Sequence, residues 1–109
     1  MAVFIHFTER AQVHRAPVTA GAYTRRRDWE MAQQVWEGWV SAQPSSTTEA
    51  RSPDRDLLSE TLHVYLPTDA VVGRHDRIDV DGITYEIEGE PEHHRGPRPH
   101  IRITAWRAR

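Results

Sequence analysis

The dipeptide Asp81-Gly82 constrains the fold of this 109-residue chain more than any other short feature. Asp-Gly favours a two-residue type I′ turn, because both central residues of that turn need positive φ angles. Apolar and polar residues alternate on both sides of it, which is typical of β-strands with one buried face. The turn predicts three cross-strand pairs: Val80 with Ile83, Ile78 with Tyr85, and Arg77 with Glu86. Turn and alternation therefore agree on one antiparallel hairpin with a single apolar face.

The same stretch, residues 76–92, holds seven of the sixteen carboxylates. Catalytic carboxylate pairs need partial burial to separate their pKa values. The alternation instead directs Asp79, Glu86 and Glu88 outward and assigns Asp81 to the turn. The other three, at strand ends or in a loop, are Asp76, Glu90 and Glu92. We interpret all seven as solvated and expect no catalytic pair, so the chain is not expected to be an enzyme.

Alternating patterns predict further strands at residues 3–8, 61–67 and 100–106. In the last of these, Ile101, Ile103 and Ala105 are expected to point inward. Pro, Gly and polar residues mark loops or connectors. These are expected at residues 15–27, 68–75 and 89–99.

Residues 28–40 fit two structures. Tryptophans at 29, 36 and 39, with Ala32, follow the spacing of a helical face, and Asp28 could cap a helix. Gly38 and the Val- and Trp-rich run at 35–40 favour a strand instead. The pattern leaves both open, including a short helix near residues 28–34.

Residues 41–60 form the plainest loop, with two prolines, many Ser and Thr residues and charges of both signs. Loops of this length inside a compact domain are usually functional or disordered. Neither flank is long enough to fold alone, so we predict one domain over residues 1–109, with a long flexible loop at 41–60. The fold class is mainly β: a small antiparallel barrel or sandwich with this loop between central strands.

Composition excludes several functions. The net charge of −2 argues against a dedicated nucleic-acid binder, which usually has a basic excess. The chain has no cysteine, so disulfides and zinc thiolate sites are excluded. No apolar run reaches the roughly 20 residues of a membrane span, and the first residues do not read as a signal peptide. Synthesis in the cytoplasm is the expectation.

Seven histidines raise the question of a metal site. His93 and His94 are adjacent and His100 follows, but none of these spacings matches a known metal motif. We interpret them as exposed loop residues and expect no metal and no cofactor. Arg25–Arg27 beside Tyr23 and Trp29 is interpreted as a solvated charge run.

Two groups suggest contact surfaces. Trp29, Trp36 and Trp39 lie within eleven residues, and partly exposed aromatics are typical of interface centres. The C-terminal segment is basic while the hairpin before it is acidic. This polarity could pair neighbouring subunits of a ring or strands within a monomer, and the sequence leaves both open. The basic residues of that segment are Arg95, Arg98, Arg102, Arg107 and Arg109.

The order of these segments resembles the head-to-tail stopper, or head-closure, proteins of tailed bacteriophages, especially phages of actinobacteria. The carrying stretches are "VWEGWVSAQPSSTTEA", "TLHVYLP", "DRIDVDGITYEIEGEPE" and "HIRITAW". The hairpin matches the family pattern at Asp76, Val80, Asp81, Gly82, Tyr85, Glu86, Gly89, Glu90 and Pro91. The resemblance spans nearly the whole chain in order and implies a strand, not a helix, at residues 35–40.

The resemblance implies a virion neck protein, made in the bacterial host, that forms a ring with itself. Its neighbours would be a portal or adaptor protein on the head side and a tail terminator or tail tube protein on the tail side. Packaged double-stranded DNA would be blocked sterically by a channel loop. The loop candidates are Ser45, Thr47, Glu49, Arg51, Asp54 and Arg55. The subunit or neck interface candidates are Trp29, Trp36, Trp39, Arg102 and Arg107. The alternatives are another neck protein, such as an adaptor or tail terminator, or a small β-barrel that binds nucleic acid.

Overall fold

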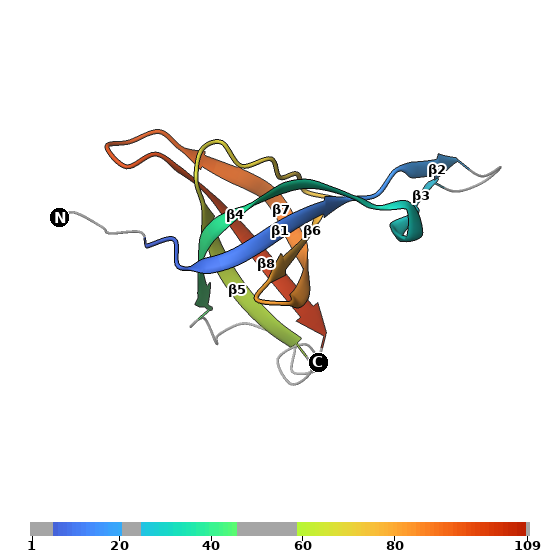
Figure 1. Ribbon diagram of the computed structural model, residues 1–109, viewed down its shortest axis with the longest axis horizontal. Coiled ribbons are helices and arrows are strands. Elements are labelled where there is room, and N and C mark those ends of the chain that lie inside the picture. Colours follow the sequence, from blue (N-terminus) through green and yellow to red (C-terminus); the bar gives the residue numbers. More distant parts are fainter. Residues whose placement is uncertain (1–5, 21–24, 46–58, 109) are drawn as a thin grey trace.

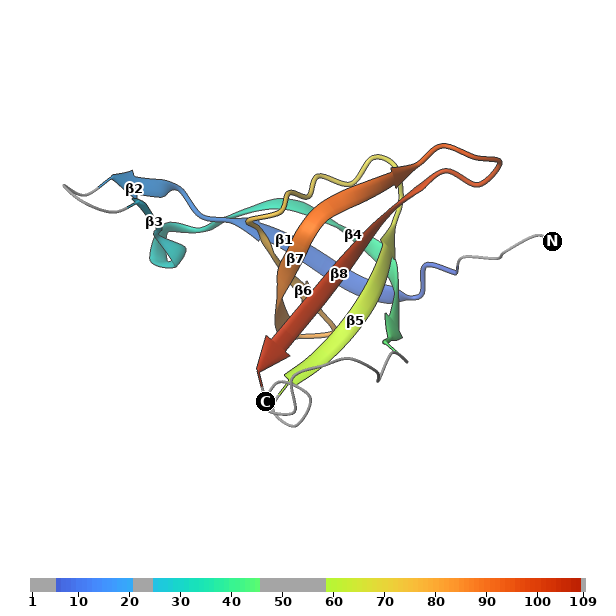
Figure 2. The same cartoon turned by 180° about the vertical axis from the view of Figure 1, so that it is seen from behind.

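The computed structural model describes residues 6–20, 25–45 and 59–108 and shows a closed barrel of six antiparallel strands (Figures 1 and 2). Around the barrel the strands follow the order β1, β4, β5, β8, β7, β6, and β6 pairs with β1 to close it. Their bounds are β1 Glu9–Arg15, β4 Gln33–Pro44, β5 Ser59–Leu66, β6 Arg77–Val80, β7 Ile83–His94 and β8 His100–Ala108. The predicted mainly-β class is confirmed, as a barrel and not a sandwich.

An arm projects from one end of the barrel, where β1 and β4 extend past the other strands (Figure 1). Its described residues are 16–20 and 25–32, which include the short strands β2 (Val18–Ala20) and β3 (Arg25–Arg27). One 3₁₀ turn, η1 (Trp29–Met31), follows, and the Asp28 side chain accepts a hydrogen bond from the Glu30 N–H. The helical alternative for residues 28–34 is thus limited to this turn. β4 confirms the strand at 35–40. No helix in the described ranges is long and apolar enough to cross a membrane.

The hairpin of β6 and β7 has the predicted register. Arg77 pairs with Glu86, Ile78 with Tyr85 and Val80 with Ile83. The turn residues have φ angles of 51° at Asp81 and 84° at Gly82, as a type I′ turn requires. One side chain departs from the predicted apolar face: Ile83 is 41% exposed, because the first residue of β7 lies at the rim of the barrel.

The turn glycine supports a testable prediction. Replacing Gly82 with alanine should lower the free energy of unfolding by about 1 kcal/mol, since an L-residue pays to adopt this positive φ. No atom lies within 4 Å of the added Cβ, so a clash does not contribute. Urea denaturation measures the change. Gly96→Ala is the matched control, because that loop glycine also has open space and lacks the positive φ. Equal losses at both positions would contradict the assigned turn geometry.

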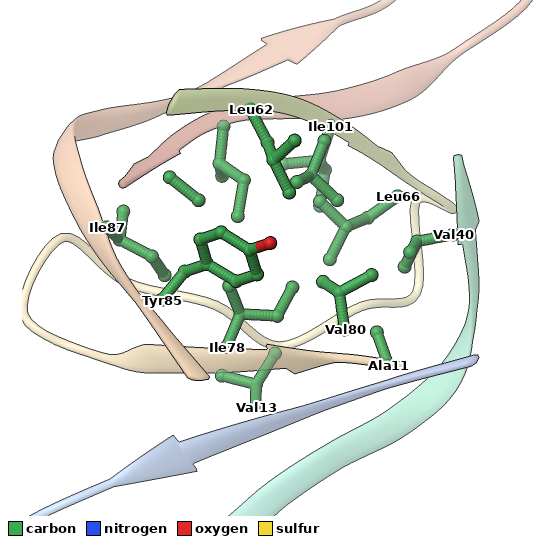
Figure 3. Close-up of a cluster of buried hydrophobic side chains, with 13 residues drawn as sticks. Ala11, Val13, Val40, Leu62, Leu66, Ile78, Val80, Tyr85, Ile87 and Ile101 are labelled. Carbon is green, nitrogen blue, oxygen red and sulfur yellow. The ribbon is translucent and has the colours of Figure 1, made fainter. Parts of the chain in front are cut away.

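The core fills the inside of the barrel with one apolar cluster (Figure 3). Alternate residues of each strand point inward, and the predicted inward set on β8 (Ile101, Ile103 and Ala105) is at most 2% exposed. The remaining members are Ala11, Val13, Val40, Leu62, Val64, Leu66, Ile78, Val80, Tyr85 and Ile87. The connector at residues 67–76 adds Ala70 and Val72 against this cluster.

Several sequence predictions are wrong in their bounds. Residues 6–8 are not in a strand, and the first strand of the described residues begins at Glu9; residues 3–5 of the predicted strand lie outside the described residues. The predicted loop at 15–27 contains β2 and β3. The cause is tertiary pairing: β1 is held between β4 and β6, so its polar sequence still forms a strand.

The predicted loop at 89–99 is also mostly strand, since β7 runs to His94. A bulge explains why the sequence reads as a loop. The pairing with β8 jumps from Glu88–Thr104 to Glu92–Arg102, so three residues of β7 face one of β8. The bulge accommodates Gly89 and Pro91, and only residues 95–99 connect the two strands.

Candidate assembly surfaces

The predicted channel loop is shorter than residues 41–60. Its first part, Ser41–Pro44, belongs to β4 and pairs with β5, and its last two residues begin β5. Of the loop candidates only Ser45 is described, and its N–H donates to the Thr61 carbonyl at 3.0 Å. Five candidates lie outside the described residues: Thr47, Glu49, Arg51, Asp54 and Arg55. The two strands that flank residues 46–58, β4 and β5, are neighbours in the barrel.

An ion pair anchors the end of the barrel where this segment re-enters. Arg107 Nε donates to Glu60 Oε1 at 2.8 Å, and this hydrogen bond raises the Arg107 pKa above its usual value. The guanidinium also lies 5.9 Å from the centre of the Tyr85 ring. Arg107 is therefore engaged within the fold, and its role at an interface stays a prediction.

Trp29 and Trp36 are partly buried. Trp36 packs against the core and lies over Gly38, where an added Cβ would be 2.5 Å from the indole. The Trp29 ring stacks under the Arg77 guanidinium, whose carbon lies 4.0 Å from the ring centre. Both rings therefore make contacts within this chain.

Trp39 differs from the other two, because its side chain points away from the core and the residue is 53% exposed. It lies on the outer surface of the β1–β4 pair, opposite Arg10. Arg10 lies 5.5 Å from the indole and pairs with Glu37 at 3.1 Å. This hydrogen bond lowers the Glu37 pKa, with Gln12 adding a second one. We call the surface of Arg10, Glu37 and Trp39 the Trp39 surface.

The acidic and basic strands pair within the chain. Arg102 on β8 contacts Glu92 of β7 at 3.5 Å and His63 of β5 at 3.2 Å, and Arg107 pairs with Glu60. Arg102, an interface candidate, is thus half-buried between neighbouring strands, and its Nε is buried with no hydrogen-bond partner in the described structure. The intrachain alternative for the charge polarity therefore accounts for Arg102, whereas Arg107 pairs with a residue of β5, outside the acidic hairpin.

The prediction that all seven hairpin carboxylates are solvated is wrong for Asp76. This residue is 3% exposed and receives two hydrogen bonds from Arg15, at 2.9 and 2.8 Å. A third comes from the Gly73 N–H at 2.7 Å. Asp76 precedes β6 directly, where it joins the connector to the end of β1 and the base of the arm. No local sequence pattern predicts this pair, since Arg15 and Asp76 are 61 residues apart.

A small cleft lies where the arm meets the barrel, and sequence reasoning missed it. Its volume is about 220 Å³, below the roughly 300–1,000 Å³ of small-molecule pockets. Its lining is mostly charged, and Asp76 in its wall is already paired with Arg15. The lining residues are Arg27, Trp29, Arg74, His75, Asp76, Arg77, Glu86 and Ile87. Among these described lining residues there is no Ser, Thr or Cys nucleophile, and one of the two carboxylates, Asp76, is paired.

The histidines do not assemble into a metal centre in the described part of the chain, where no group of three metal-ligating residues was found. The rings of His94 and His100 stack at 4.6 Å across the β7–β8 hairpin, and Tyr65 lies 5.6 Å from His100. These rings are part of a surface, on the outer side of β5, β7 and β8.

Comparisons with known proteins show a similarity to solved structures. No family model and no curated protein match the chain. Among solved structures, the chain is similar to one chain in "Virion of native gene transfer agent (GTA) particle". The TM-score is 0.61 at 14% sequence identity, and the match covers 99% of this chain and 98% of that one. At this identity the similarity establishes the shared fold.

Proposed function

We propose that this chain is a structural protein of a tailed-phage-like virion and acts there as a head-to-tail stopper. The carrying observation is the shared fold with a chain of a gene transfer agent virion, over almost the full length of both chains. The order of sequence segments that resembles stopper proteins adds the specific role. In this proposal the protein has no enzymatic activity and no cofactor.

The stopper forms a ring with itself, below the portal or adaptor protein and above the tail terminator or tail tube protein. Its location is the neck of the virion. Assembly also compensates for the modest core of a 109-residue chain, because partner binding stabilises a folded state by mass action.

The segment between β4 and β5 is the proposed channel loop. Residues 45–58, between these two strands, carry three acidic and two basic side chains, which sum to −1. A loop rich in phosphate contacts would hold DNA electrostatically and resist its ejection. A loop without a basic excess can instead block DNA by its volume and then yield when the tail signals release.

Removing the gene from its parent phage tests the proposal. Electron microscopy should show heads that have lost their DNA beside free, complete tails, and the intact gene supplied in trans should restore joined particles. A variant lacking residues 46–57 keeps Ser45 and the Ser59 start of β5. It should restore tail joining but not DNA retention. Normal infectious particles without the gene would overturn the stopper role. Full heads together with overlong tails would instead indicate a tail terminator. Particles that lack the part of the neck above the stopper would indicate an adaptor.

A nucleic-acid-binding barrel is the second candidate, and one surface favours it. The outer face of β5 and β8 presents half-buried Tyr65, His100, Arg102 and Trp106. Aromatic and basic side chains together are the typical platform for single-stranded nucleic acid. The acidic outer side of the β6–β7 hairpin and the net charge of −2 count against it. Salt-dependent retention of single-stranded DNA by the purified protein, lost in Tyr65→Ala, would support this candidate.

A further inference from the structure

Exposed apolar side chains lie near both ends of the β1–β4 pair, on β4 at one end and on the arm at the other. Trp39 lies near one end, where Glu9 pairs with Val40. At the other end Arg15 pairs with Gln33, and the arm continues beyond that pair (Figure 1). Trp39 lies six positions beyond Gln33 along β4, which corresponds to roughly 20 Å of strand. The two ends are therefore too far apart to cover each other within one chain.

The arm exposes apolar side chains that the described residues leave uncovered. Val18 on β2 is 48% exposed and Met31 at the end of η1 is 63% exposed. Two short strands without a further layer are marginally stable in water. Methionine is flexible and makes favourable contacts with aromatic rings, so Met31 is suited to pack on an indole.

Charged side chains of both signs border the two apolar ends. The arm carries the basic Arg26 and Arg27 and the acidic Asp28 and Glu30, and Arg27 also donates to the Ala16 carbonyl at 3.1 Å. The Trp39 surface carries Glu37 and Arg10, a pair of which both side chains are more than a third exposed. An exposed ion pair contributes little to stability, so it can exchange partners at small cost. An apolar centre with a charged rim is the usual composition of a protein interface.

We propose that the arm of one copy docks on the Trp39 surface of a second copy of this chain. Met31 and Val18 pack against the Trp39 indole, and the charged side chains of the arm pair with Glu37 and Arg10. The contact joins two different surfaces, so it is heterologous. A heterologous contact repeats from copy to copy and closes into a ring when the rotation permits. The proposal rests on the ring of the proposed function and identifies the contact that builds it.

The chain has no cysteine, so engineered thiols can test the contact directly. The double variant Met31→Cys/Glu37→Cys, concentrated and mildly oxidised, should give a ladder of disulfide-linked dimers, trimers and larger species. Each single variant can give at most a dimer. The matched control is Met31→Cys/Thr104→Cys, because Thr104 lies on the outside of β8, three strands from β1 in either direction. A ladder from the first pair alone supports the contact. No ladder, or equal ladders from both pairs, overturns it.

A second variant separates the contact from the stopper role. Trp39→Glu should leave the thermal unfolding midpoint nearly unchanged, because the side chain is exposed, yet abolish the ladder and fail to rescue the gene deletion. Trp39→Phe should keep both. A ladder together with normal particles after gene deletion would leave the contact standing and remove the stopper role. A protein that rescues the deletion with Trp39→Glu would overturn the contact and leave the stopper role intact, with the arm then free to meet a different neck protein.

Discussion

Replacing Ile103 with alanine is expected to lower the free energy of unfolding by about 3 kcal/mol, within the range of large-to-small changes in a closed core. Ile103 is 2% exposed and lies on β8, between β5 and β7. It pairs with Val64 of β5, which is fully buried. A barrel encloses its core on all sides, so the surrounding strands cannot move inward without breaking their ladder. We therefore expect most of the cavity to remain.

A graded series makes this prediction specific. Ile103→Val should cost about 1 kcal/mol, and Thr104→Ala, the outward neighbour on the same strand, less than that. Urea denaturation of the purified protein measures all three. A domain of this size has a total stability of about 5–15 kcal/mol, so the alanine variant should remain folded but with a clearly lower midpoint. If Ile103→Ala lowered the free energy of unfolding no more than Ile103→Val, the strands would have closed the cavity. That result would contradict the prediction.

The hairpin of β6 and β7 could be predicted from the sequence because all of its determinants are local. Asp81 and Gly82 fix the turn, the turn fixes the register, and the register agrees with the alternation on both strands. The same local logic identified the inward residues of β8. A strand at residues 35–40 needed more, since the tryptophan spacing equally fits a helix. There the resemblance to stopper proteins decided correctly.

Features that depend on tertiary contacts escaped prediction. The polar residues of β1 read as no strand, and only pairing on both sides makes them one. Gly89 and Pro91 read as a loop because a bulge is locally indistinguishable from a turn. Among the candidate site residues, the spacing of the tryptophans could not show that Trp36 packs over Gly38 while Trp39 points outward. That difference follows from the alternation of β4, in which Val40 is the buried neighbour.

The two single alanine variants of the Arg15–Asp76 pair are expected to lose different amounts of stability. Arg15→Ala should lower the free energy of unfolding by about 3 kcal/mol, because it leaves a buried carboxylate without its counterion. The Asp76 side chain is 2% exposed, whereas that of Arg15 is 44% exposed. Asp76→Ala should therefore cost less, about 2 kcal/mol, since the remaining guanidinium can turn into water and mainly hydrogen bonds are lost. Chemical denaturation of the two variants gives both values.

The double variant Arg15→Ala/Asp76→Ala should be more stable than Arg15→Ala alone, because it removes the stranded charge along with its partner. Arg74→Ala is the matched control: its pair with Glu90 is exposed on both sides and should contribute less than about 1 kcal/mol. If Arg15→Ala and Arg74→Ala lowered the free energy of unfolding equally, the burial of Asp76 would not contribute to stability.

The Arg15–Asp76 pair also joins the connector to the end of β1, where the arm begins. Its loss should therefore raise amide hydrogen exchange in β2 and β3 before it does so in β8, and a uniform rise would mean that the arm and the barrel unfold as one unit.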